Sequence, residues 1–138
     1  MIPLRRTAWT LTAIYAGFHF VMTHIPPGNV PRLGPSNYLL HFLSYGFLAG
    51  CVYVSLWLGG ATATRASLVV IAGAALFATF DELLQSPVGR DPDFLDWAVD
   101  VAGALVAAGC LSIARILLDR RASRSNDPRP PLAVSQDS

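Results

Sequence analysis

Apolar residues in this chain fall into four long runs that are separated by short polar links. The runs extend over residues 7–25, 37–58, 67–85 and 93–118. At a rise of 1.5 Å per residue, about 20 residues of helix cross the ~30 Å hydrocarbon core of a bilayer. The pattern therefore predicts an all-α integral membrane bundle of four transmembrane helices.

The composition supports a membrane protein and excludes two other classes. Hydrophobic residues make up 53% of the 138 residues and charged residues only 14%, which is unlike an ordinary soluble domain. The basic residues, all arginines, flank the apolar runs and form no stripe, which argues against nucleic-acid binding. We predict one membrane domain over residues 1–121, with the lipid bilayer as its surroundings, and a disordered cytoplasmic tail over 122–138 that is polar and contains prolines.

The arginines also predict the orientation. Arg5 and Arg6 precede the first run, and five more arginines follow near the other end of the chain: Arg115, Arg120, Arg121, Arg124 and Arg129. Basic residues accumulate on the cytoplasmic side, so both termini should be cytoplasmic, as an even number of spans permits. The ends of runs one and three and the starts of runs two and four should then share the outer side.

Polar residues interrupt the apolar runs in two places, along the first run and around the link between the third and fourth runs. In the first run, Thr12, Tyr15, His19 and Thr23 follow helical spacing, which favours hydrogen bonding to another helix. Most of the acidic residues lie in residues 80–103, where run three ends and run four begins after a link short enough to require an antiparallel hairpin. Helical periodicity and the shared outer side predict one cluster, whose members are His41, Tyr45, Asp81, Glu82, Gln85, Arg90, Asp96 and Asp100.

Helix capping explains only part of this acidity. Asp93 stands at a predicted helix start, where a carboxylate caps exposed N–H groups. Asp100 lies beyond the capping turn between two valines, where an ionisable group costs up to about 2.5–3.5 kcal/mol at the bilayer centre. Arginine holds a carboxylate by two parallel hydrogen bonds, so we expect Arg90 to pair with Asp81 or Asp96.

Three chemistries fit such a cluster. The carboxylates and histidine could hold a divalent cation, act as a general acid and base, or hydrogen-bond a polar headgroup or ligand. The chain contains no HExxH, GxSxG or P-loop motif. Catalytic residues, a metal and a cofactor are therefore left unassigned at this point.

At these residues the chain resembles the VanZ-like family of small bacterial membrane proteins. The resemblance rests on HFLSY (His41, Tyr45), FDELLQ (Asp81, Glu82, Gln85), Arg90 and FLDWAVDVAG (Asp96, Asp100, Gly103). The chain departs from the family pattern in two places. Asn37 and Tyr38 stand where relatives have an acidic–basic pair, and Asp100 stands where relatives have asparagine.

The resemblance implies a multi-pass protein of the bacterial inner (cytoplasmic) membrane. Some relatives are linked to tolerance of teicoplanin-type glycopeptides. We expect a non-enzymatic envelope protein whose outer cluster binds a polar ligand, a lipid headgroup or a partner. The alternatives are a membrane enzyme acting on a lipid-linked envelope substrate and an accessory subunit that docks on other membrane subunits through its small-residue faces.

Overall fold

The computed structural model describes residues 2–25, 37–88 and 92–125, and within these ranges the chain is helical and contains no strand. The helices are α1 (Ile2–Thr23), α2 (Asn37–Leu58), α3 (Ala63–Gln85), the short 3-10 helix η2 (Ser86–Val88) and α4 (Phe94–Ser125). The predicted all-α class is confirmed.

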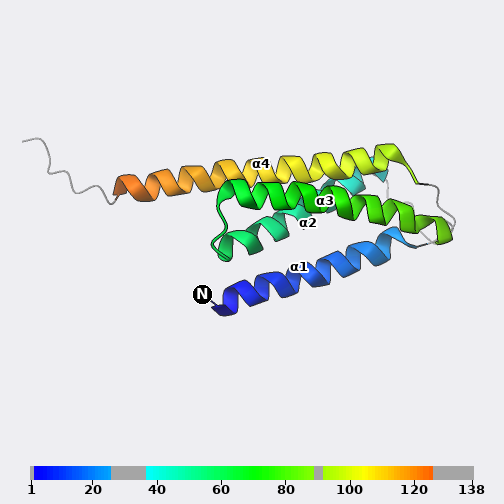
Figure 1. Ribbon diagram of the computed structural model, residues 1–138, viewed down its shortest axis with the longest axis horizontal. Helices are drawn as coiled ribbons and strands as arrows, with labels where there is room; N and C mark the ends of the chain where they lie inside the picture. Colours follow the sequence, from blue (N-terminus) through cyan, green and yellow to red (C-terminus); the bar gives the residue numbers. More distant parts are fainter. Residues whose placement is uncertain (1, 26–36, 89–91, 126–138) are drawn as a thin grey trace, which may run out of the picture.

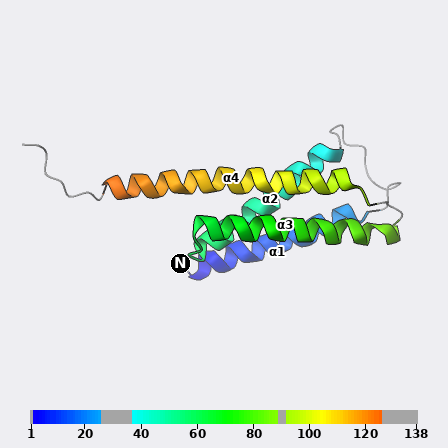
Figure 2. The same ribbon diagram turned by 45° about the horizontal axis from the view of Figure 1, so that its top comes forward.

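The four long helices alternate in direction along one axis (Figure 1). The ends of α1 and α3 lie with the starts of α2 and α4, and we call this the polar end of the bundle. The start of α1, the short α2–α3 turn and the final turns of α4 lie at the opposite end, the arginine end (Figure 2). The predicted antiparallel hairpin between α3 and α4 is therefore confirmed.

Three of the described helices, α2, α3 and α4, are long and apolar enough to cross a membrane. The second predicted run coincides with α2, whereas α1 begins at Ile2 and so takes Arg5 and Arg6 into its first turns. These two arginines and several threonines make α1 more polar than α2 and α3. A transmembrane position for α1 remains a prediction.

The predicted tail begins too early. Helix α4 continues through Ser125, so residues 122–125 are helical, and residues 126–138 lie outside the described part. Arginine and alanine are good helix formers, and Arg124 in the last turn interacts favourably with the negative end of the helix dipole. These local preferences extend α4 beyond its apolar run.

The closest packing joins α2 to α4. A Cβ atom added to Gly103 would collide with the carbonyl oxygen of Phe42, and one added to Gly46 would lie 3.2 Å from the Gly103 oxygen. Small residues continue this contact into the core, which consists of Ala49, Tyr53, Ala66, Val70, Ala104 and Ala108. Small residues let helices approach closely, and Gly46 and Gly103 allow such an approach here.

Helix α1 packs along α2, touches α3 at few points and makes no described contact with α4. Polar contacts hold it in place: the Thr12 and Ser55 hydroxyls are 3.1 Å apart, and the Tyr15 hydroxyl donates to the Ser44 carbonyl at 3.3 Å. The predicted interhelical hydrogen bonding of the α1 stripe is confirmed for these two residues.

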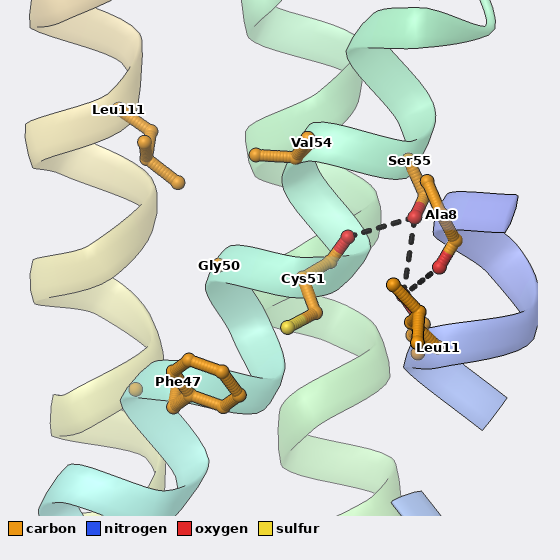
Figure 3. A pocket seen from close by; sticks show the side chains of 10 residues that line it. Ala8, Leu11, Phe47, Gly50, Cys51, Val54, Ser55 and Leu111 are labelled. Carbon is orange, nitrogen blue, oxygen red and sulfur yellow. Dashed lines mark hydrogen bonds between the residues drawn. The ribbon is translucent and has the colours of Figure 1, made fainter. Parts of the chain in front are cut away.

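Two apolar spaces flank α1. One is a groove of about 430 Å³ over α2, and Figure 3 shows Leu11 of α1 and Leu111 of α4 on its two sides with Gly50 and Val54 between them. The other is a partly open cavity of about 300 Å³ lined by residues of α1, α2 and α3. We call the second space the three-helix cavity.

The Gly103 contact makes a direct prediction. Gly103→Ala should lower the free energy of unfolding in detergent by about 1–3 kcal/mol, because the added methyl group forces two backbones apart. Gly109→Ala on the same helix is the control, since a Cβ atom there meets nothing within 4 Å. Equal stability of the two variants in a denaturant titration would contradict the packing described here.

Candidate functional site

All four long helices contribute polar side chains to the polar end. Asp81 and Asp100 are the most deeply buried carboxylates, with 1% and 0% of their surfaces exposed. The remaining buried members of the predicted cluster are His41, Tyr45, Glu82 and Gln85, and Asp96 is half-buried. The antiparallel arrangement brings these residues together, because each lies near the end or start of its helix on the same side.

His41 joins α2 to two carboxylates of α4. Its Nδ1 atom lies 3.0 Å from Asp100 Oδ1, and its Nε2 atom lies 3.9 Å from Asp96 Oδ2. Asn37, one turn earlier on α2, donates from its amide nitrogen to both Asp96 oxygens at 3.1 and 3.3 Å. The imidazole is therefore fixed in orientation, with one nitrogen on each carboxylate.

Asp81 joins α3 to α1. Its Oδ1 atom accepts a hydrogen bond from the Thr23 hydroxyl at 2.8 Å and lies 3.6 Å from His24 Nδ1. The predicted site did not include Thr23 or His24, although both end the first apolar run on the predicted outer side. Helical spacing placed Thr23 on a polar stripe, but only the packing shows that this stripe reaches Asp81.

Glu82 fixes the connection between α3 and α4. Its Oε2 atom accepts a hydrogen bond from the backbone N–H of Asp93 at 2.8 Å, and Gln85 donates to its Oε1 atom at 3.4 Å. Asp93 in turn accepts from the backbone N–H of Leu95 at 2.8 Å, which confirms its predicted role as a cap of α4. Glu82 is thus oriented from both sides of the hairpin.

Two deeply buried polar atoms of the predicted cluster, the Tyr45 hydroxyl and Asp100 Oδ2, make no well-formed hydrogen bond within the described part of the chain, and Nε2 of the neighbouring His19 and His24 is unpaired there as well. The Tyr45 hydroxyl lies toward Asp81, with which it makes only a poorly aligned hydrogen bond, and it also interacts electrostatically with Asp100 and Glu82. A buried polar group without a partner costs about 1–3 kcal/mol, so this cluster is not a fully paired structural network.

Arg90 lies outside the described residues, so its predicted pairing with Asp81 or Asp96 remains a prediction. Among the described side chains, the basic groups within ion-pair distance of Asp81, Asp96 and Asp100 are the imidazoles of His24 and His41. The described part of the cluster therefore contains more carboxyl groups than basic side chains.

Three side chains of the cluster lie close enough together to offer ligand atoms for a metal ion, and an apolar space lies beside the cluster. His41, Glu82 and Asp96 offer ligand atoms that all lie within 4.8 Å of one another. The three-helix cavity reaches the cluster through Tyr45 and Phe77, and Phe77 lies one turn before Asp81 on α3. The predicted cluster thus borders a space with the chemistry of a lipid chain.

The chain matches no protein-family model, no curated protein and no solved structure. The VanZ-like resemblance therefore remains a prediction, based on the motifs of α2, α3 and α4. The geometry of the polar end and of the neighbouring cavity carries the functional argument.

The Thr23–Asp81 contact is testable because α1 contains a matched control. Thr23 and Thr10 each donate to a carbonyl of their own helix at 3.0 Å, but only Thr23 also donates to Asp81. Thr23→Val should lower the free energy of unfolding by about 1–2 kcal/mol, whereas Thr10→Val should change it little. In a double-mutant cycle with Asp81→Asn in detergent, a coupling energy near zero would rule out this contact.

Proposed function

We propose that this chain is a VanZ-like, four-span protein that binds the polar headgroup of an envelope lipid. The headgroup occupies the cluster at the polar end, and an acyl or similar apolar chain enters the three-helix cavity. In this arrangement α1 is the fourth span, both termini are cytoplasmic, and the polar end faces the outside of a bacterial inner membrane.

One observation carries the proposal: a buried, incompletely paired polar cluster adjoins an apolar cavity. Tyr45 belongs to both, since its ring lines the cavity and its hydroxyl faces the carboxylates. A site with one polar and one apolar part suits an amphiphile better than it suits a soluble ligand or a protein surface. The excess of carboxylates favours headgroups that present hydrogen-bond donors or a bound cation.

The distribution of arginines supports the proposed orientation. The start of α1, with Arg5 and Arg6, and the last turns of α4, with Arg120, Arg121 and Arg124, lie at the end of the bundle opposite the cluster. Basic residues of this kind accumulate on the cytoplasmic side. The polar end is then the outer end.

The same observation favours a second candidate, a membrane enzyme acting on a lipid-linked envelope substrate. Asp81, Glu82, Asp96 and Asp100 lie with His41 beside the cavity, where they could exchange protons with a bound headgroup. Lipid binding is common to both candidates. Turnover of a bound lipid by the purified protein would distinguish the enzyme from the binding protein.

Cysteine labelling tests the orientation. In a background in which the free Cys51 and Cys110 are replaced by alanine, single cysteines at Asn29 and Val88 should react with an impermeant reagent in intact cells. A cysteine at Ser125 should react only after the membrane is opened. Labelling of Val88 from the cytoplasm would overturn the outer position of the cluster.

Lipid binding is tested with two matched glycine variants. A Cβ atom at Gly73 or at Gly109 meets nothing within 4 Å, but Gly73 lines the three-helix cavity and Gly109 does not. Gly73→Leu should fill the cavity and reduce co-purified lipid about tenfold, as counted by native mass spectrometry after mild detergent extraction. Gly109→Leu should retain the lipid. Equal lipid content in the two variants, or no lipid in the parent, would contradict the proposal.

A further inference from the structure

We infer that His41, Glu82 and Asp96 bind a divalent transition-metal ion, for which Zn²⁺ is the best match, and that Asp100 positions His41 for this role. The inference rests on the proposed function in treating the polar end as a ligand site. It goes further by assigning an ion, its three ligands and a positioning residue.

The distances between the ligand atoms are slightly longer than such an ion requires. They come from α2, α3 and α4 and lie within 4.8 Å of one another, with 3.9 Å between His41 Nε2 and Asp96 Oδ2. Donor atoms about 2.0–2.2 Å from an ion are ~3–4 Å from each other. Side-chain adjustments of about 1 Å therefore close the site without moving the helices.

His41 is already arranged as a metal ligand. Its Nδ1 atom pairs with Asp100 Oδ1 at 3.0 Å, which leaves Nε2 directed toward Asp96. Histidines that bind metals usually donate their other N–H to a carboxylate, which fixes the tautomer and makes the ligand more basic. Asp100 occupies that position.

Both carboxylate ligands are held by neighbouring groups as well. Glu82 accepts from the Asp93 N–H and from Gln85, and Asp96 accepts from Asn37. Such outer contacts orient ligands and reduce the entropy lost when an ion binds. Asn37 gives Asp96 a hydrogen-bond donor that adds no net charge.

The two buried atoms without partners provide an independent indication of a ligand. The Tyr45 side chain is 1% exposed and Asp100 is fully buried, and the hydroxyl of Tyr45 faces the carboxylates of the cluster. An ion with a coordinated water brings positive charge and donor hydrogens to this place, and ordered waters in proteins commonly satisfy buried polar groups in this way. The Tyr45 hydroxyl and Asp100 Oδ2 are not among the proposed ligand atoms, so their incomplete hydrogen bonding is a separate observation.

A ligand set of one imidazole and two carboxylates favours some metal ions over others. Imidazole nitrogen suits Zn²⁺ and other transition metals, whereas Mg²⁺ and Ca²⁺ prefer oxygen ligands alone. Three protein ligands leave one Zn²⁺ position open, as in sites where the metal contacts a ligand or water. The open position gives an otherwise negative cluster a way to accept an anionic oxygen of a headgroup.

The test uses metal ions alone. The purified full chain is stripped with chelator in detergent and titrated with ZnCl₂, MnCl₂ and MgCl₂ by isothermal calorimetry. The parent should bind one Zn²⁺ per chain and bind Mg²⁺ at least 100-fold more weakly. His41→Gln, Glu82→Gln and Asp96→Asn should each weaken Zn²⁺ binding at least 100-fold, and Asp100→Asn should weaken it by about 10- to 100-fold.

His24→Gln is the matched control, because His24 lies at the same end of the bundle on Asp81 and outside the ligand set. It should keep the parent affinity. Circular dichroism and thermal unfolding of the metal-free variants identify any that fail to fold, and Co²⁺ absorption spectra of the folded variants report loss of the nitrogen ligand in His41→Gln. Parent affinity in His41→Gln, or equal loss in His24→Gln, would overturn the assignment.

The lipid experiment and the metal experiment test the two proposals independently. Co-purified lipid with no saturable Zn²⁺ binding would reject the metal site and leave the proposed function standing. Saturable Zn²⁺ binding that depends on His41, without any bound lipid, would reject the proposed function and retain the metal site.

Discussion

The close approach of α2 and α4 at Gly46 and Gly103 determines most of the geometry described above. Gly103 lies against the Phe42 carbonyl, which is adjacent to His41, and Asp100 lies one turn before Gly103 on α4. With the two backbones this close, His41 and Asp100 come within 3.0 Å of each other. A side chain at either glycine would separate the helices and, with them, the histidine from its carboxylates.

Four carboxylates at one end of the bundle repel one another when they are ionised. Two unit charges about 4 Å apart interact by roughly 4 kcal/mol at an effective dielectric constant near 20, so charges of one sign need compensation. In the described part of the chain, His24 lies beside Asp81, and His41 lies between Asp96 and Asp100. The protein thus distributes the acids into two groups, one tied to α1 and one shared by α2, α3 and α4.

Helix α1 is attached differently from the other three. Its contacts with α2 and α3 include hydrogen bonds from Thr12, Tyr15 and Thr23, whereas α2, α3 and α4 share a core of small apolar residues. A single hydrogen bond contributes about 1 kcal/mol to stability, so these contacts hold α1 less firmly than the shared core holds the other three helices. The three-helix cavity lies between α1, α2 and α3.

The helical class, the antiparallel hairpin and the faces that carry the polar residues could be predicted from the sequence, because these follow from hydrophobic periodicity and link length. The sequence did not determine which side chains pair. The predicted pairing of Arg90 with Asp81 or Asp96 lies outside the described residues, and the described partners of Asp81 include Thr23 of α1, His24 directly after that helix, and Gln85. Which histidine meets which carboxylate depends on the rotation and register of each helix. Those are decided by the contact between Gly46 and Gly103 and by how α1 rests on α2, and both join residues far apart in the sequence.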